Sequence, residues 1–413
     1  MKVNCIIFFV FALVLASSAQ IAPNDFVSTG TDNTDMVFYE LSTGNKTTSS
    51  NTDWHLAISI RPTEFPGTPL GGTTIRINEA NGVHAIYVPN ANASQFDNVD
   101  TTGWGNWGLL HDADSILDEG ALNSNRSAGI FDFGWGNYNS VSHDVNGDSL
   151  YLIQLPNGEL KKFMVVVLDR DTAYNIKYSD INNSNVQTLH ISKRDYIGKN
   201  FVYLNMQTNI VYDKEPLSAN WDLLFTKYAA RDAVSGEAIA KVGVLANKGR
   251  VIGKATGTDA ALPYFTGSTS SMMNAIGWNW CTYNSQTDEY VAADSLSYFI
   301  KDAASFEYKL VLTNYEGPST GIIRFNKLDN MATGIGNITA ISVSAYPNPA
   351  NNSLTITSDA TTTAHISDLN GRVIDTIAIN EGNNTYATST LANGMYILSL
   401  GNGQAVKKLI VQH

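Results

Sequence analysis

The chain has 413 residues, of which 26 are basic and 38 acidic, so its formal net charge is −12. Only 15% of the residues are charged and 43% are hydrophobic, which excludes a largely disordered protein. A nucleic-acid surface needs clustered Lys and Arg to neutralise phosphates, so the acidic balance argues against a nucleic-acid partner. The length predicts two or three domains.

Residues 1–19 have the pattern of a secretory signal peptide. Lys2 gives a positive start, residues 6–16 are almost continuously apolar, and Ser17-Ser18-Ala19 offers small residues for cleavage. The apolar run is shorter than the ~20 residues that span a bilayer, so we expect no transmembrane span in the mature chain. Cys281 is the one cysteine after this segment, which leaves no partner for an internal disulfide.

From about residue 27 to residue 330 the pattern is that of β-strands. Short apolar runs alternate with clusters of Gly, Asn, Asp and Ser, and Asn146-Gly147 and Asn157-Gly158 are turn signals because both residue types tolerate positive φ. No long amphipathic helix is indicated. The predicted fold class is therefore all-β.

An internal repeat divides this region into two. Three blocks at residues 151–154, 162–165 and 176–178 recur at a constant offset of 147 residues, at 298–301, 309–312 and 323–325. Two further matches are Gly134-Trp135 and Tyr138-Asn139 with Gly277-Trp278 and Tyr283-Asn284, and Trp54 to Ala57 with Trp221 to Phe225. We therefore predict two tandem β modules, residues 27–190 and 191–330.

Residues 331–340 are predicted to be a linker, and residues 341–413 differ in character. About seven short strands, with turn signals every 8–12 residues, predict a small Ig-like β-sandwich. This segment carries, in order, the motifs Tyr346-Pro347-Asn348-Pro349-Ala350, Asp368-Leu369-Asn370-Gly371-Arg372, Asn393-Gly394-Met395-Tyr396 and Lys407-Lys408-Leu409-Ile410-Val411.

These motifs resemble the type A C-terminal sorting domain of the type IX secretion system of Bacteroidetes. The resemblance implies the secretion machinery as a partner and a secreted or cell-surface location, on the outer side of the outer membrane. It leaves open whether the domain is removed or used for anchoring. The implied sorting-signal residues are Tyr346, Pro347, Asn348, Pro349, Gly371, Arg372, Gly394, Tyr396, Lys407 and Lys408.

The two modules resemble the HmuY family of haem-binding surface proteins. The resemblance lies in an aromatic strand that ends near an Asp-Trp-Asp block, a Gly-Trp block and a closing aromatic hairpin. The matching segments are Asp53-Trp54, Gly134-Trp135 and residues 151–178 in the first module, and Trp221-Asp222, Gly277-Trp278 and residues 298–325 in the second. It implies two HmuY-like modules and a planar apolar ligand, with haem as the candidate cofactor.

The family pattern has a histidine after the Gly-Trp block, which this chain lacks at the matching position. His143 lies three residues beyond Ser140, and His111 lies upstream; neutral imidazole suits haem iron. His143 is thus the candidate haem-iron ligand, and the alternative is a turn residue beside Asp144. The candidate ligand-binding residues are His143, His111, Tyr138, Trp135, Trp278 and Tyr283.

The sequence therefore predicts a secreted, non-enzymatic binding protein that captures haem or a similar planar ligand. Two alternatives stay open: a surface adhesin or structural protein without a small ligand, and a glycan-binding protein. Gly317-Pro318-Ser319-Thr320-Gly321 fits the letters of a catalytic serine turn, but we interpret it as a β-hairpin loop. The oligomeric state is not indicated.

Overall fold

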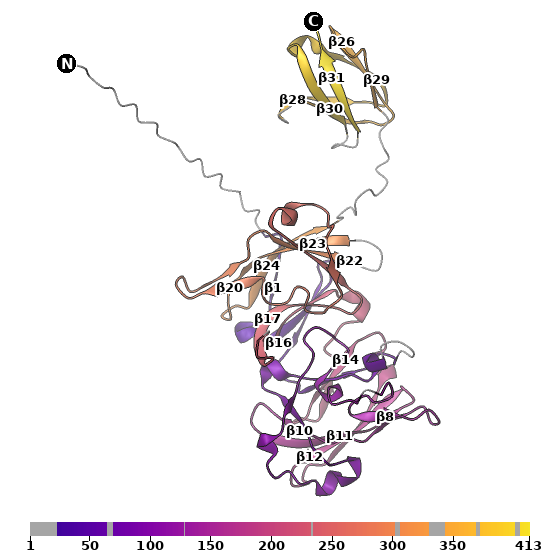
Figure 1. The fold of residues 1–413 in the computed structure, drawn as a ribbon, viewed down its shortest axis with the longest axis vertical. Helices are drawn as coiled ribbons and strands as arrows, with labels where there is room; N and C mark the ends of the chain where they lie inside the picture. Colours follow the sequence, from indigo (N-terminus) through magenta and orange to yellow (C-terminus); the bar gives the residue numbers. More distant parts are fainter. Residues whose placement is uncertain are drawn as a thin grey trace, which may run out of the picture. The chain divides into compact units, whose positions relative to one another are not determined.

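Figure 1 shows the computed structural model, which describes residues 23–63, 69–127, 129–232, 234–301, 306–329, 343–368, 372–400 and 405–413. The predicted signal peptide and linker lie outside these ranges. The described chain consists of antiparallel strands and short 3-10 helices, which confirms the all-β class. Contacts divide it into two compact units at residues 331 and 332. We call residues 23–329 the body and residues 343–413 the tail domain.

The body contains two β-sandwiches, each with an inner and an outer sheet. The inner sheet of sandwich 1 has the order β15 (Ile210–Tyr212), β14 (Phe201–Asn205), β4 (Leu56–Ser59), β5 (Ile75–Ile77). Its outer sheet has the order β13 (Gln187–Ser192), β12 (Ala173–Asp180), β11 (Leu160–Asp169), β10 (Tyr151–Gln154), β6 (His84–Tyr87), β7 (Leu109–Leu110), joined by β8 (Gly136–Tyr138) and β9 (Val145–Gly147).

Sandwich 2 repeats this plan. Its inner sheet has the order β3 (Lys46–Ser50), β2 (Asp35–Tyr39), β16 (Leu223–Arg231), β17 (Ala238–Ala246). Its outer sheet has the order β1 (Asp25–Ser28), β24 (Ile322–Asp329), β23 (Phe306–Tyr315), β22 (Leu296–Lys301), β18 (Val251–Thr256), β19 (Thr269–Ser270). The hairpin of β20 (Cys281–Asn284) and β21 (Glu289–Ala292) corresponds to β8 and β9.

The short 3-10 helices lie in the connections. They are η1 (Thr31–Asn33), η2 (Pro69–Gly72), η3 (Glu79–Asn81), η4 (Ala93–Asn98), η5 (Trp104–Asn106), η6 (Ala121–Asn123), η7 (Lys193–Tyr196), η8 (Ser218–Asn220), η9 (Gly257–Ala261) and, in the tail domain, η10 (Thr388–Thr390). Within the described residues, no helix is both long and apolar enough to cross a membrane.

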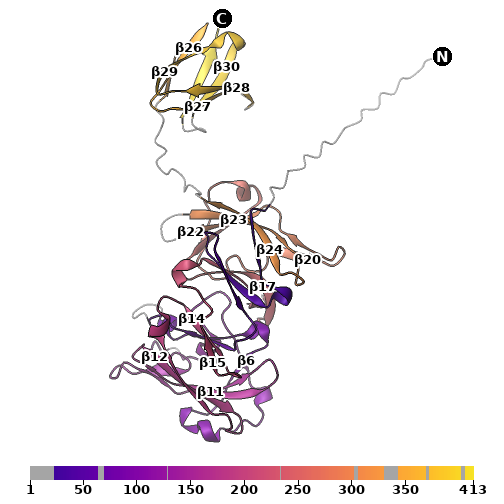
Figure 2. The ribbon, with the colours of Figure 1, turned by 180° about the vertical axis from the view of Figure 1, so that it is seen from behind.

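The two sandwiches have the same strand order, but sandwich 2 is closed by the N-terminus. The strands β13, β14 and β15 end sandwich 1, and their places in sandwich 2 are taken by β1, β2 and β3. β1 pairs with β24 and β2 pairs with β16, and Figure 2 shows the indigo N-terminal strands in the part of the body that contains β24. The observed sandwiches therefore do not meet at the predicted boundary between residues 190 and 191. Sandwich 1 continues to β15, and the first three strands of the chain complete sandwich 2, so the repeat is cyclically permuted.

The predicted 147-residue offset appears in the outer sheets. A β-bulge lies between Val165 and Val167 in β11, and another lies between Leu312 and Asn314 in β23, 147 residues later. The third strand departs from this offset, since β24 is shifted by two residues relative to β12 in its pairing. The turn that precedes β24 is also longer than the turn that precedes β12.

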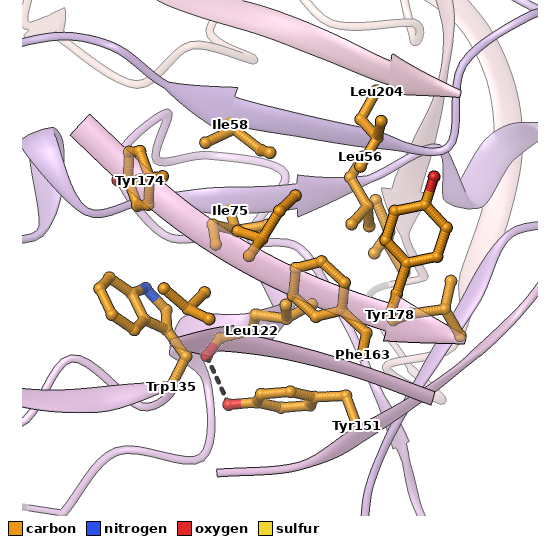
Figure 3. Close-up of a cluster of buried hydrophobic side chains, with 14 of the residues drawn as sticks. Leu56, Ile58, Ile75, Leu122, Trp135, Tyr151, Phe163, Tyr174, Tyr178 and Leu204 are labelled. Atoms are coloured by element: carbon orange, nitrogen blue, oxygen red, sulfur yellow. Dashed lines mark hydrogen bonds between the residues drawn. The ribbon is translucent and has the colours of Figure 1, made fainter. Parts of the chain in front are cut away.

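Strand periodicity explains how four sheets form three apolar layers. Successive side chains of a strand point to opposite faces, so Val37 and Tyr39 of β2 pack inside sandwich 2 while Met36 and Phe38 face sandwich 1. The core of sandwich 1 contains Tyr151, whose hydroxyl donates to the Leu122 carbonyl at 3.0 Å (Figure 3). Both faces of each inner sheet are thus buried.

The tail domain is a separate sandwich of seven described strands. A three-stranded sheet has the order β25 (Val343–Tyr346), β26 (Ser353–Ser358), β29 (Gly382–Ala387). A four-stranded sheet has the order β28 (Val373–Ile379), β27 (Thr362–Ser367), β30 (Gly394–Leu400), β31 (Ala405–Val411). Leu354, Ile366, Leu398 and Leu409 are fully buried in its core.

Candidate functional site

Two corresponding hairpins contain three of the six candidate ligand-binding residues, Tyr138, His143 and Tyr283. Hairpin 1 comprises β8, β9 and their turn, residues 136–147, and hairpin 2 comprises β20, β21 and their turn, residues 281–292. Tyr138 and Tyr283 occupy the same place in the two hairpins, in the first strand. We therefore describe the two hairpins together as the candidate site.

In hairpin 1, Tyr138 and His143 are in contact across the turn. The Tyr138 hydroxyl lies 2.7 Å from Nδ1 of His143, so it can donate a hydrogen bond to that nitrogen. The turn brings His143 there because its backbone has φ of 66° and its N–H donates to the Asn139 carbonyl. His143 is thus a turn residue, as the alternative interpretation proposed, and also a partner of Tyr138.

One exposed aromatic ring packs on this pair, and two further exposed apolar side chains lie close to it in the sequence. The Phe131 ring stacks on Tyr138 with a centroid distance of 5.7 Å and an interplanar angle of 25°. Phe131 is 46% exposed, and its neighbour Ile130 is 72% exposed. Val141, in the turn itself, is 88% exposed. Hairpin 1 therefore presents a Tyr–His pair beside an exposed aromatic ring, with Val141 exposed in its turn.

Hairpin 2 has a carboxylate where hairpin 1 has an imidazole. The Tyr283 hydroxyl donates to Oδ1 of Asp288 at 2.6 Å, and this hydrogen bond raises the pKa of Tyr283. Asp288 also has positive φ, 58°, and it lies five residues after Tyr283, as His143 does after Tyr138. The corresponding positions thus share their geometry and differ in the chemistry of the acceptor.

A polar groove of about 710 Å³ lies against hairpin 2. Tyrosine side chains and carboxylates line it together with the turn that joins β23 and β24; the lining residues include Tyr283, Asp288, Glu289, Tyr290, Glu316 and Ser319. The Glu316 carboxylate pairs with Arg324 at 2.6 Å. Ser319 has no histidine among the residues that line this groove, and its turn joins two β-strands rather than a strand and a helix.

The tryptophans that the sequence paired do not correspond in the structure. Trp135 is fully buried in sandwich 1, and its Nε1 donates to the Thr73 carbonyl at 2.8 Å. Its counterpart in sandwich 2 is the buried Trp280, whereas Trp278 is 37% exposed beneath the Lys241 ammonium. The match of Gly134-Trp135 to Gly277-Trp278 is therefore wrong by two residues. Neither Trp135 nor Trp280 can contact a ligand at the surface.

His111 belongs to a different part of the body from hairpin 1. Its Nδ1 lies 2.5 Å from Oε1 of Glu79, whose other oxygen accepts from Arg231 of β16 at 2.6 Å. This network joins sandwich 1 to sandwich 2. No contact between His111 and His143 is recorded in the described chain, and the structure does not assemble a bis-histidine site from them.

The described residues contain no group of three or more His, Cys, Asp or Glu side chains placed to hold a metal ion. Cys281 is half-buried, and burial raises the pKa of its thiol to about 11. A thiol with that pKa is almost wholly protonated at neutral pH and is a poor nucleophile.

In the tail domain, most of the sorting-signal residues lie in or directly beside the strands β25, β30 and β31. Tyr346 ends β25, and Pro347 and Pro349 follow this edge strand, where a missing N–H costs no ladder bond. The Asn348 amide donates to the Lys408 carbonyl of β31 at 2.7 Å. Gly394 and Tyr396 lie in β30, Lys407 lies in β31, Arg372 pairs with Asp368, and Gly371 lies outside the described residues.

The body is not assigned by comparison with known proteins. No curated protein matches the chain. Among solved structures, PorZ, an essential bacterial surface component of the type-IX secretion system of Porphyromonas gingivalis, is 12% identical with a TM-score of 0.17, over 74% of this chain and 43% of its own. The BSP domain of a biofilm-associated protein is 11% identical with a TM-score of 0.15, over 80% of this chain and 56% of its own. The chain thus spans less than two thirds of either structure.

The tail domain, in contrast, has a clear match. Residues 344–412 match the family described as the secretion system C-terminal sorting domain. The matched range begins and ends within two residues of the seven-stranded sandwich. The tail domain is therefore a sorting domain of the type IX secretion system, and the protein is exported by that system to the cell surface or beyond it.

Proposed function

We propose that the body is a non-enzymatic extracellular binding protein that captures haem at hairpin 1. The observation that supports this proposal is the contact of the Tyr138 hydroxyl with Nδ1 of His143, on a surface with exposed apolar side chains. Tyrosine is an established axial ligand of haem iron. The apolar faces of a porphyrin fit beside Phe131, Ile130 and Val141 better than beside a charged surface.

The pair has chemistry suited to ferric iron. Tyr138 would hold the iron through its phenolate oxygen, and Nδ1 of His143, 2.7 Å away, would accept the proton that the hydroxyl gives up. No oxidant or reductant is needed for this exchange. In this proposal Tyr138 is the ligand and His143 its proton acceptor, whereas the sequence favoured His143 as the ligand itself.

Haemin titration of the protein without residues 1–19 tests the proposal. We expect a saturable change of the Soret band at micromolar haemin, and a loss of at least tenfold in affinity for Tyr138→Phe, since the phenyl ring keeps the packing and removes the oxygen. Tyr283→Phe in hairpin 2 is the matched control and should bind as the unmodified protein does. An unchanged Soret band, or equal binding by the two variants, contradicts haem capture at hairpin 1.

Glycan binding is the second candidate, and the groove at hairpin 2 favours it. Exposed tyrosine rings can stack on a sugar face, and carboxylates accept hydrogen bonds from sugar hydroxyls. The groove offers both, with Tyr283 half-exposed and Glu289 at the surface. A glycan array probed with the protein tests this function. Binding that Tyr283→Ala abolishes and Tyr138→Ala leaves intact supports it, and binding to no glycan refutes it.

A further inference from the structure

A cavity of about 120 Å³ lies between the inner sheets of the two sandwiches, away from both hairpins. Its apolar wall comes from both sandwiches and includes Met36, Phe38, Trp54, Tyr203 and Trp221. An apolar cavity of ~150 Å³ is large enough to bind benzene. The space is somewhat smaller than that benchmark, which limits a ligand to a single ring and excludes a porphyrin.

The aromatic wall contains two equivalent ring pairs, one from each sandwich. The rings of Phe38 and Trp221 cross at 71° with centroids 5.1 Å apart, and those of Tyr203 and Trp54 cross at 72° at the same distance. Phe38 and Tyr203 occupy equivalent places in β2 and β14. The two pairs differ in one group, because Tyr203 carries a hydroxyl.

That hydroxyl lacks a hydrogen-bond partner among the described residues. Tyr203 is 6% exposed and lines the cavity. Its hydroxyl oxygen is not completely enclosed by protein atoms. Because Tyr203 lines the cavity, a ligand in the cavity is within reach of this residue. A nearly buried hydroxyl without a partner carries a desolvation penalty, which a ligand with a hydrogen-bonding group would relieve.

The acidic groups at the cavity already have partners, and the lining as a whole does not favour an anion. Glu215 accepts from the backbone N–H groups of Asn200 and Phe201, and also from the Trp221 indole. Glu79 pairs with Arg231, and Asp112 lies near Arg76. The lining has three acidic residues, Glu79, Asp112 and Glu215, and two basic ones, Arg76 and Lys227, so it offers no excess positive charge to attract an anion.

We propose that this cavity binds a small neutral aromatic alcohol of the phenol class. The ring of the ligand contacts the aromatic wall, and its hydroxyl forms a hydrogen bond with Tyr203. Ala80, Lys227 and Ala229 line the cavity and retain partial exposure, which marks the side of entry. This site is independent of haem capture, because it shares no residue with hairpin 1.

Titration of the full mature protein with phenol, and in parallel with benzene, tests the site. Tryptophan fluorescence and the thermal midpoint report on it, since Trp54 and Trp221 line the cavity. We expect saturable binding below about 10 mM phenol and about fivefold weaker binding of benzene, the value of one hydrogen bond. Tyr203→Phe should remove the preference for phenol. No saturation, or an unchanged preference in Tyr203→Phe, overturns the proposal.

A cavity-filling variant separates binding here from binding elsewhere. Ala57→Leu places a larger side chain in the wall from β4 and should abolish phenol binding in the folded protein. Ala261→Leu, at an exposed position in η9, is its control and should bind phenol normally. Phenol binding by folded Ala57→Leu equal to that of the control overturns the site. If Ala57→Leu fails to fold, the comparison of phenol with benzene in Tyr203→Phe decides.

Discussion

The two sandwiches share one strand order, yet they are assembled differently. Sandwich 1 uses a continuous stretch of chain from β4 to β15, whereas sandwich 2 begins at β16 and is completed by β1, β2 and β3. The two hairpins also share one geometry and differ at one acceptor, His143 or Asp288. We therefore attribute the features that both sandwiches share to the scaffold. The features that differ, such as the acceptor of the tyrosine hydroxyl, are specific to one sandwich.

Removal of residues 23–50 should have the largest effect on stability, and it should destabilise only sandwich 2. β2 lies between β16 and β3 in the inner sheet, so its loss exposes the core that contains Leu223 and Phe225. We expect amide hydrogen exchange to lose its protection throughout β16–β24 and to keep it in sandwich 1. Retained protection in β16–β24 would show that sandwich 2 does not depend on the N-terminal strands.

The acceptors of the two equivalent indoles predict a pH dependence of stability. Nε1 of Trp54 donates to the amide oxygen of Asn51, whereas Nε1 of Trp221 donates to the carboxyl group of Glu215. Burial raises the pKa of Glu215 from 4.5 to about 7. A raised carboxyl pKa means that the folded state holds the proton more tightly, so the contribution of Glu215 to stability is fully present at low pH and is lost as the pH rises through this window.

Deprotonation of Glu215 should lower the unfolding free energy by about 3 kcal/mol between pH 4.5 and 7. Asp112, whose pKa burial raises to about 6, adds a loss of the same sign. Urea denaturation at a series of pH values measures both. Glu215→Gln should flatten much of the dependence, and Glu237→Gln at an exposed site should not alter it. An unaltered slope in Glu215→Gln contradicts the assignment.

Asp288→His tests whether the acceptor alone distinguishes the hairpins. The substitution gives Tyr283 the partner that Tyr138 has, at the same spacing and with the same positive φ. If hairpin 1 captures haem through its Tyr–His pair, the variant should bind a second haemin, with an affinity at least tenfold above that of unmodified hairpin 2. Soret titration gives the stoichiometry. One equivalent in both proteins would mean that the exposed apolar side chains of hairpin 1 are also required.

Local patterns predicted the strands and the tail domain, but not the closure of the body. Strand periodicity and turn residues are local, and the sorting motifs are short, so each is visible in a few residues. The pairing of β1 with β24 joins residues about 300 positions apart and has no local signal. The Tyr138–His143 contact had a signal that was missed, since Tyr283 and Asp288 repeat its five-residue spacing.

The smallest expected difference is in the unfolding free energies of variants at two equivalent buried indoles, Trp135 and Trp280. Nε1 of Trp135 donates to the Thr73 carbonyl, whereas Nε1 of Trp280 is buried without a recorded partner in the described chain. Substitution by Phe removes similar ring volume at both sites, but only Trp135→Phe also loses a hydrogen bond. We expect Trp135→Phe to lower the unfolding free energy by about 1 kcal/mol more than Trp280→Phe does. Equal losses in urea denaturation would mean that the Trp280 N–H is paired in solution, with water as the available partner.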